Sequence, residues 1–550
     1  MDRAWNTLAR NRAARLERAA GVAGVRGKFC PAESATALLE AVLEAGDRVC
    51  VEGNNQKQAD FLAAALARIE PGGHVRDLHM VQSVIALPEH LAVFERGLAT
   101  RIDFSFSGPQ GGRLAQLLTE RKIQLGAIHT YLELFSRYFI DLTPRVSLIA
   151  ALAADAAGNL YTGPNTEDTP AVVEATAFKN GIVIAQVNEI RDTLPRVDIP
   201  ADWVDFVVQS PKPFFIEPLF TRDPAQITEI QVLMAMMVIK GIYAPYEIQR
   251  LNHGIGFDAA AIELLLPTYA ESLGLRGLIC QHWALNPHPA LIPAIESGFV
   301  ETVHSFGSEL GMEPYIAARP DIFFTGADGS LRSNRAFCQA AGHYACDLFI
   351  GSTLQIDLQG NSSTATRDRI TGFGGAPNMG ADARGRRHPS PGWLRAGRET
   401  YADAPMPRGR KLVVQMVESY RAGMSPAFVE RLDAWDLAVL AGLELPPVMI
   451  YGDDVTHIVT EEGIAHLLRC RNLEDRAAAI RAVAGYTPVG LARSRSETQD
   501  LRRRGIVQRA EDLGIDPRLA TRDLLAARSM KDLVRWSGGL YQPPKRFRNW

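Results

Sequence analysis

Two continuous apolar runs, residues 146–154 (VSLIAALAA) and 181–188 (GIVIAQVN), constrain the fold of this chain most strongly. Each is short, contains β-branched residues and is bounded by turn formers, which is typical of a strand buried on both faces. Between them lie a turn at residues 155–159 (DAAGN) and a helical pattern at residues 171–180 (AVVEATAFKN). This alternation of strand, helix and strand predicts a parallel sheet covered by helices.

The same alternation recurs along most of the chain. A helical pattern at residues 34–46 leads into a short strand, RVCVEG, and then into a second helical pattern at residues 56–69. Another run starts with a helix at residues 227–242 and includes an expected strand at residues 274–280 (GLRGLIC). Similar content in both halves predicts an α/β protein with two related lobes, each a mixed or parallel sheet flanked by helices.

The chain is too long for a single hydrophobic core, because 550 residues exceed the usual size of one domain. A Pro-rich, non-periodic segment at residues 199–224 indicates the connection between lobes. We therefore predict an N-terminal lobe at residues 1–225, a C-terminal lobe at 226–485 and a basic extension at 486–550. The extension is either a solvated helical tail or a docking arm for an acidic partner.

Composition excludes several classes of function. The net charge is −3, so no overall field favours nucleic acid, and no apolar run is long enough to span a bilayer. None of the six cysteines forms a CxxC pair, which favours a reducing, cytoplasmic compartment. The histidines do not fall at the spacing of metal ligands, so we expect no metal site.

The most informative motif is a Gly-rich loop, RDRITGFGGAPNMG, which starts at Arg367. Gly372, Gly374 and Gly375 fall within four residues, so backbone N–H groups can closely approach a phosphate or a developing oxyanion. Arg367 and Arg369 can pair with phosphates. A tight turn that needs small residues explains the glycines equally well. The loop is not a Walker loop, since no GK[ST] follows it.

Two further turns carry polar or small residues after expected strands. Asn54, Asn55 and Gln56 follow RVCVEG, and side chains at such a position often face a ligand crevice. Gly254 and Gly256 precede a helix, whose N-terminus offers free N–H groups to an anion. Both segments are also ordinary turn formers, and that alternative stays open.

Five segments in order resemble the acetyl-CoA hydrolase and CoA-transferase superfamily over roughly residues 45–470. They are VSLIAALAADAAGN, GIVIAQVNE, NHGIGFDAA, GFGGAPNMG and VTHIVTEEGIAHL. Within this group the whole chain is similar to the α-subunit family of biotin-independent malonate decarboxylases. That likeness includes VEGNNQKQADFLA, the stretch at residues 321–365 and the basic C-terminal end.

The resemblance implies two CoA-transferase-like lobes and transfer of an acyl carrier protein from acetyl to malonate, with malonyl-S-carrier and acetate as products. It implies no permanently bound cofactor, but a carrier with a phosphoribosyl-dephospho-CoA arm, or CoA. The implied partners are the carrier subunit and the decarboxylase subunits that act on the malonyl thioester.

The loops that match the family's motifs give the candidate site. We expect Gly375 and the amides Asn54, Asn55 and Gln56 to act at the acyl group. The expected binding residues for the CoA-like arm are Gly254, Gly256, Gly372, Gly374, Ala376 and Asn378.

One departure from the family bears on mechanism. Many relatives have a catalytic Glu in an H-[ST]-E-M stretch shortly before a DG pair, whereas Phe324 or Thr325 stands there, ahead of Asp328 and Gly329. We therefore expect direct attack of malonate on the acetyl thioester through a mixed anhydride, a route similar to that proposed for a related citrate lyase subunit. A free-standing CoA-transferase or acetyl-CoA hydrolase, and a non-catalytic carrier-docking scaffold, stay open as alternatives.

Overall fold

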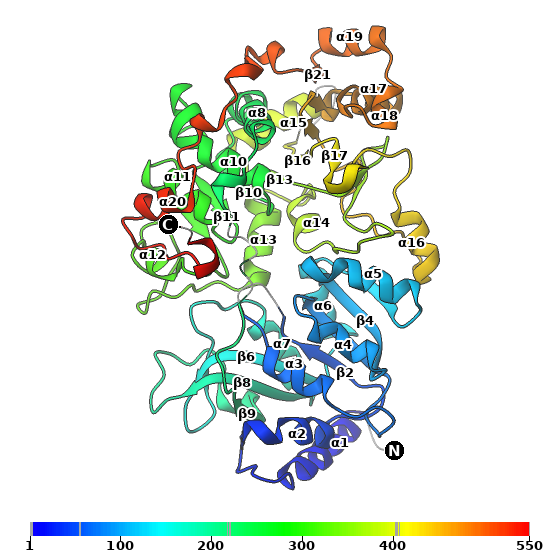
Figure 1. The fold of residues 1–550 in the computed structure, drawn as a ribbon, viewed down its shortest axis with the longest axis vertical. Helices are drawn as coiled ribbons and strands as arrows, with labels where there is room; N and C mark the ends of the chain where they lie inside the picture. The colour runs from blue at the N-terminus through cyan, green and yellow to red at the C-terminus, as the bar shows by residue number, and fades with distance from the viewer. Residues whose placement is uncertain are drawn as a thin grey trace.

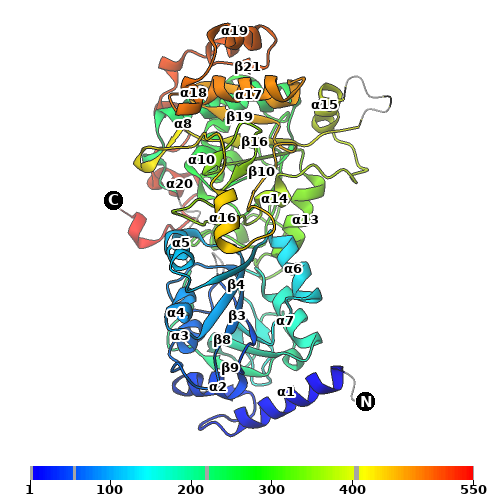
Figure 2. The ribbon, with the colours of Figure 1, turned by 90° about the vertical axis from the view of Figure 1, so that its right-hand side faces the viewer.

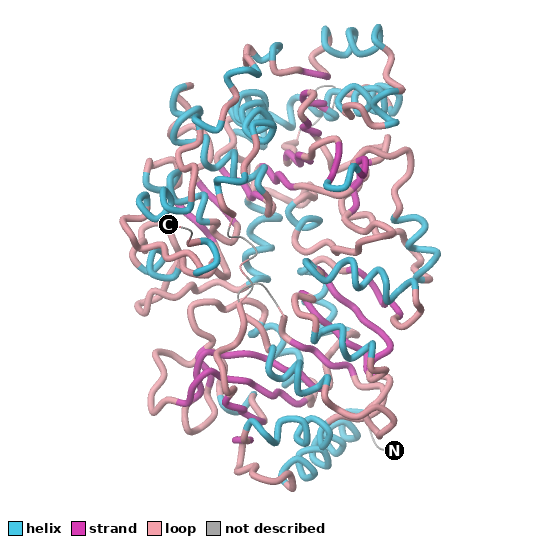
Figure 3. Tube along the Cα trace, viewed as in Figure 1, coloured by secondary structure: helices cyan, strands magenta, loops and turns pink. Residues whose placement is uncertain are grey.

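Two sheets, one in each half of the molecule, organise the fold. The computed structural model describes residues 4–53, 57–216, 218, 222–401, 405, 408–548 and 550. In Figure 1 the first sheet lies in the blue and cyan half and the second in the green to orange half. Helices cover both sheets, as Figure 3 shows, so the predicted α/β architecture is confirmed.

The first sheet is parallel apart from one short strand. The two apolar runs form β6 and β8, which pair in parallel as predicted. The short β7 (Leu160–Tyr161) is antiparallel to β6. The sheet order is β1 (Phe29–Cys30), β9 (Phe206–Gln209), β8 (Ile182–Ile190), β6 (Val146–Ala154), β2 (Arg48–Val51), β3 (Leu78–Val84), β4 (Ala99–Phe106) and β5 (Gln124–Ile128).

Helices pack on both faces of this sheet and bury a hydrophobic core on each. Figure 2 views the layers from the side, with α3, α4 and α5 on one face and α6 and α7 on the other. The helix α1 (Ala4–Ala20) packs beside α2. The covering helices are α2 (Ala35–Val42), α3 (Asp60–Ala67), α4 (Glu89–Glu95), α5 (Gly111–Thr119), α6 (Tyr131–Ile140) and α7 (Thr169–Phe178).

The second sheet is parallel through its first six strands and antiparallel at the last two. Its order is β12 (Thr302–His304), β11 (His282–Ala284), β10 (Arg250–His253), β13 (Leu348–Gly351), β16 (Leu412–Met416), β19 (His457–Thr460), β20 (Gly463–His466) and β21 (Val507–Gln508). The larger core lies under α8 (Glu229–Val238), α10 (Phe257–Leu265), α11 (Ile292–Glu296) and α20 (Met530–Trp536), and a smaller one under α17 (Leu473–Val483).

Two expectations for this half differ from the structure. Residues 274–280 form turns instead of a strand, since Gly274, Gly277 and Cys280 have positive φ angles that break an extended chain. The basic C-terminal segment is not a solvated tail, because it supplies β21 and buries Leu533 and Tyr541 completely. The division of the chain at residues 225 and 485 stays a prediction. Within the described ranges, no helix combines the length and apolarity needed to cross a membrane.

The Gly-rich loop of the second half docks onto the first half through backbone hydrogen bonds. The amides of Phe373 and Gly374 donate to the carbonyl of Ser105 at 2.7 and 2.9 Å, and the amide of Tyr131 donates to the Gly374 carbonyl. Gly372 has a φ of +79°, and a Cβ there would lie 2.4 Å from the Ser105 carbonyl oxygen. Glycine is therefore required at 372 both for its conformation and for the close approach of the two lobes.

We predict that Gly372→Ala lowers the free energy of unfolding by about 1–3 kcal/mol, because it combines a strained φ with a backbone clash. Urea unfolding followed by tryptophan fluorescence measures the change. Gly385→Ala is the matched control, since nothing lies within 4 Å of a Cβ at Gly385. Equal midpoints for the two variants would show that the docked loop does not need glycine at 372.

Candidate active site

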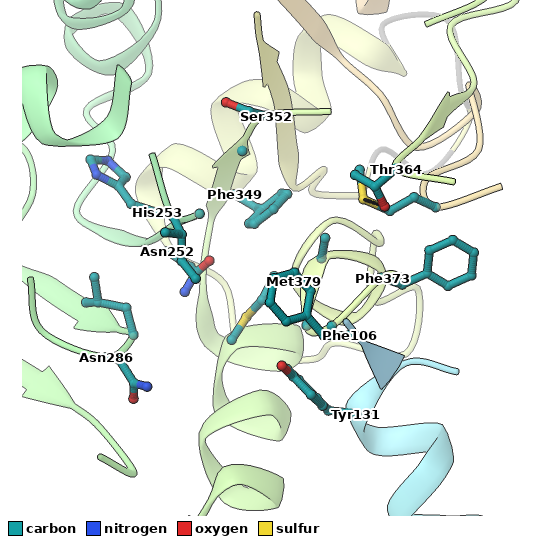
Figure 4. A pocket seen from close by; sticks show the side chains of 18 of the residues that line it. Phe106, Tyr131, Asn252, His253, Asn286, Phe349, Ser352, Thr364, Phe373 and Met379 are labelled. Carbon is teal, nitrogen blue, oxygen red and sulfur yellow. Dashed lines mark hydrogen bonds between the residues drawn. The ribbon is translucent and has the colours of Figure 1, made fainter. Parts of the chain in front are cut away.

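A cavity of about 430 Å³ lies between the two lobes. Its walls come from the carboxyl ends of β4, β10 and β13, from the start of α6, from α13 (Arg335–Ala345) and from the Gly-rich loop. Ligands in open α/β folds bind beyond the carboxyl ends of the strands, so the position suits a binding site. Figure 4 shows Thr364 and Phe373 on one side of the cavity and Asn252 and Asn286 on the other.

The helix α13 forms a rigid wall between the lobes. It stands in the centre of Figure 1 and contacts α6 of the first half. Arg335, Cys338 and Gln339 share one helical face, at spacings of three and four residues, and all three line the cavity. At the other end of α13 the fully buried Lys411 donates to the carbonyl of Gly342 at 2.8 Å. A buried cation at a helix C-terminus satisfies free carbonyls and complements the helix dipole.

Arg335 is the centre of a buried ion cluster that joins the lobes. Its side chain is 1% exposed, and its Nε donates to Asp168 at 2.5 Å while Nη2 donates to Glu167. The guanidinium lies over the rings of Tyr131 and Phe306, at 4.3 and 4.6 Å from their centroids. Two acidic side chains of the first lobe occupy the guanidinium, so Arg335 links the lobes rather than offering a free cation to substrate.

Glu167 has the marks of a strained, functionally placed residue. Its φ is +50°, its side chain is fully buried, and its Oε1 has no hydrogen-bond partner among the described residues. Burial, with a smaller contribution from the nearby Asp168, raises the pKa of Glu167 to about 8 against the opposing effect of Arg335. Lys57 and Glu52, 3.4 Å apart and also fully buried, complete the cluster. Left-handed backbone and a strongly shifted carboxyl pKa cluster at functional sites.

The structure brings five of the predicted site residues together and separates two others. Lining the cavity are Gly254, Gly372, Gly374, Gly375 and Ala376. Gly256 caps the start of α10 and Asn378 donates to Gln339 at 3.4 Å, and neither lines the cavity. Asn54, Asn55 and Gln56 lie outside the described residues.

The Gly-rich loop offers fewer free amides than its sequence suggests, because those of Phe373 and Gly374 bind Ser105. The Gly375 amide has no acceptor in the part of the chain that the structure describes. A Cβ at Gly375 would lie 2.5 Å from Nε2 of Gln339, so glycine lets this amide side chain approach the loop. The predicted catalytic role of Gly375 stays a prediction.

The position expected from the sequence for the family's catalytic Glu lies away from the cavity. Phe324 is 64% exposed, and neither it nor Thr325 lines the cavity. Phe306 does line it, directly after His304 and Ser305, which supply the histidine and hydroxyl of an H-[ST]-E stretch at the end of β12. His304 and Ser305 were the signal in the sequence that could have directed attention to Phe306. Phe306 carries no carboxylate, and the route without a covalent glutamyl intermediate stays a prediction.

Three arginines line the cavity in the described ranges, and their surroundings differ. Arg335 is balanced by two acids, and burial lowers the pKa of Arg222, which lies near Glu309. Arg369 is exposed, and its guanidinium donates hydrogen bonds to the neutral oxygens of Thr371 and Gly108. Positive charge is therefore present both inside the cavity and on its exposed rim.

Comparison with known proteins gives matches over the whole chain. Residues 4–550 match the family model described as malonate decarboxylase, alpha subunit, transporter. A protein of Malonomonas rubra, named acetyl-S-ACP:malonate ACP transferase, is 61% identical over 100% of both chains. A chain in the crystal structure of a Pseudomonas malonate decarboxylase hetero-tetramer in complex with malonate is 60% identical, with a TM-score of 0.96 and full coverage of both chains. The malonate decarboxylase alpha subunit of Acinetobacter baumannii is 56% identical, with a TM-score of 0.94 over 99% of this chain and 100% of that one.

A more distant likeness concerns the fold alone. An acyl-CoA transferase from Escherichia coli O157:H7 is 15% identical, with a TM-score of 0.51 over 80% of this chain and 88% of that one. The predicted CoA-transferase-like architecture is thereby confirmed.

We predict that Glu167→Gln removes a pH dependence of stability. The pKa of Glu167 is raised from 4.5 to about 8, so the stabilisation that its bound proton provides is complete below pH 4.5 and is lost as the pH rises through 8. Gln keeps the acceptor for Arg335 and cannot ionise. As the pH rises from 5 to 9, the unfolding free energy of Glu167→Gln should therefore increase by on the order of 1–3 kcal/mol relative to that of the parent.

Urea unfolding at several pH values measures this difference, with Glu430→Gln, at an exposed loop position, as the control. Parallel pH profiles for the parent and Glu167→Gln would contradict a protonated Glu167 in the folded protein.

Proposed function

The chain belongs to the family of malonate decarboxylase α subunits, and we propose that its inter-lobe cavity is where an acyl carrier protein passes from an acetyl group to malonate. The observation that carries the proposal is a cavity built from both lobes and closed by the docked Gly-rich loop. The full-length identity of 61% to an acetyl-S-ACP:malonate ACP transferase supports the same reaction.

A thioester-bearing arm is the substrate that this cavity suits. Its walls include the apolar side chains of Phe106, Phe349, Phe373, Met379 and Met449, which can pack against the methylene and methyl groups of a flexible pantetheine-like arm. We propose that the arm is the phosphoribosyl-dephospho-CoA group of a carrier subunit, or CoA itself. Decarboxylase subunits are the further partners, in line with the hetero-tetramer of the Pseudomonas relative. The cytoplasm stays the predicted location.

The proposed chemistry has two steps in which bonds balance without a covalent enzyme intermediate. A carboxylate oxygen of malonate attacks the acetyl carbonyl, the C–S bond breaks, and the carrier leaves as a thiolate beside an acetyl–malonyl anhydride. The thiolate then attacks the malonyl carbonyl of the anhydride, and acetate leaves with the bridging oxygen. A thiolate is a competent leaving group, so no strong general acid is needed.

The site residues match the demands of these steps. Both steps pass through tetrahedral oxyanions, which fixed N–H donors stabilise, and the free amide of Gly375 is one such donor. Asn54, Asn55 and Gln56 are proposed to contact the acyl group from the first lobe. The anhydride must be shielded from water, and walls contributed by both lobes favour this. Phe306 beside the cavity favours the direct route, because it cannot form a glutamyl thioester.

A single-turnover experiment tests both the function and the route. Enzyme in excess over acetylated carrier is mixed with malonate labelled with ¹⁸O in its carboxylates, and the acetate formed is analysed by mass spectrometry. The direct route predicts malonyl-S-carrier and one ¹⁸O atom in the acetate of the first turnover, without CO₂. Unlabelled acetate would place an enzyme carboxylate between the two substrates and overturn the direct route.

No transfer to the carrier, together with turnover of free acetyl-CoA, would replace the proposed function by that of a CoA-transferase or hydrolase. Binding of the carrier without either activity would favour the alternative function, a non-catalytic docking scaffold.

We predict that Asn54→Ala and Asn55→Ala each lower kcat for transfer by about 10-fold or more, since removing one oxyanion-hole donor costs at least that much in other acyl-transfer enzymes. The KM for acetylated carrier should change little, because we propose that other residues bind the arm. Unfolding midpoints equal to the parent's would confirm that the variants are folded. Unchanged kcat in both variants would remove these amides from the acyl site.

A further inference from the structure

Arg369, the exposed arginine on the rim of the cavity, has no carboxylate partner among the residues that the structure describes. Nε of Arg369 donates to Oγ1 of Thr371 at 3.2 Å and Nη2 to the carbonyl of Gly108 at 3.5 Å. Among the described residues no carboxylate oxygen lies within 4 Å of its guanidinium. The neighbouring Asp368 instead accepts a hydrogen bond from Thr366.

A second arginine two positions earlier in the same loop provides a contrast. The Arg367 side chain is 69% exposed, and its guanidinium pairs with Asp436 on α16 (Ala434–Ala441) and approaches Asp433 at 3.9 Å. Arg367 does not line the cavity, whereas Arg369 does. In the loop, Arg367 is thus paired with acidic side chains. Arg369 lines the cavity and has no acidic partner among the described residues.

Contacts with the first lobe determine the position of the Arg369 side chain. The amide of Ile370 donates to the carbonyl of Gly111, the first residue of α5, at 3.0 Å. A Cβ at Gly111 would lie 3.2 Å from Cγ of Arg369, so the glycine leaves room for the arginine stem. The guanidinium consequently lies beside the N-terminal end of α5, where the helix dipole adds positive potential.

From this geometry we propose that Arg369 is the anchor for the phosphate groups of the carrier's arm, while the apolar cavity takes the thiol-bearing part. The inference rests on the proposed function and deepens it. A planar guanidinium forms paired charge-assisted hydrogen bonds with phosphate oxygens, and its present partners are neutral oxygens that a phosphate can outcompete. An exposed position on the rim suits phosphates, which keep part of their hydration, and a dry interior suits the arm's apolar segment.

The test compares Arg369→Gln with Arg367→Gln on two acetyl donors. One is the acetylated carrier with its full phosphate-bearing arm, and the other is acetyl-pantetheine, which has the same thioester without phosphate. Arg369→Gln should raise KM for the carrier about 10-fold with little change in kcat, and leave acetyl-pantetheine kinetics unchanged. Arg367→Gln should match the parent on both donors, and Arg369→Lys should recover part of the loss.

A KM for the carrier that Arg369→Gln leaves unchanged would overturn the inference, as would an equal loss on both donors, since that indicates a structural role. If the parent protein itself transfers nothing, the proposed function fails, and calorimetric binding of dephospho-CoA still decides the anchor. Binding that Arg369→Gln weakens and Arg367→Gln does not would support it, and equal binding by all three proteins would refute it.

Discussion

The buried contacts of Arg335 with Glu167 and Asp168 are the constraint on which the rest of the site depends. Removing a guanidinium and its acidic partners from water is costly, and the cost is offset only when the geometry of every bond is kept. Loss of one partner would leave an uncompensated buried charge, so the loop of the first lobe and α13 of the second cannot shift independently. The Gly-rich loop adds backbone bonds to Ser105 and Tyr131. Together these contacts fix the width of the cavity.

The alternation of apolar strands and helical patterns was enough to predict both sheets, because buried parallel strands such as β6 and β8 leave a local signal. Contacts between residues far apart in the sequence leave no such local signal. The spacing of glycines pointed to the loop that lines the cavity. Glycine is required at position 372, however, because the carbonyl of Ser105, far away in the sequence, lies close to it. The ion cluster at Arg335 could not be predicted from the sequence for a similar reason, since a charged residue in a polar stretch is normally solvated.

The wrong strand and the untested position of the catalytic Glu each have a physical explanation. Residues 274–280 are apolar enough for a strand, but positive φ angles at Gly274, Gly277 and Cys280 turn the chain, and the strand starts at His282. The position of the missing glutamate was sought next to Asp328 and Gly329, although the end of β12 carries His304 and Ser305. Only the structure shows that the residue after this pair, Phe306, faces the cavity. The absence of a catalytic glutamate therefore stays a prediction at either position.

The electrostatic balance of the cluster bears on how anionic substrates enter. Lys57 and Arg335 supply two positive charges, and Glu52, Asp168 and Glu167 supply three acids. Burial raises the pKa of Glu167 to about 8 and also raises that of Glu52, so desolvation disfavours negative charge on this cluster. An ionised Glu167 would add a negative charge behind the cavity, where it would oppose the entry of the anionic substrates that we propose. Burial of Glu167, whose Oε1 has no partner among the described residues, therefore limits the negative charge behind the cavity, while Arg222 inside it and Arg369 on its rim attract anions.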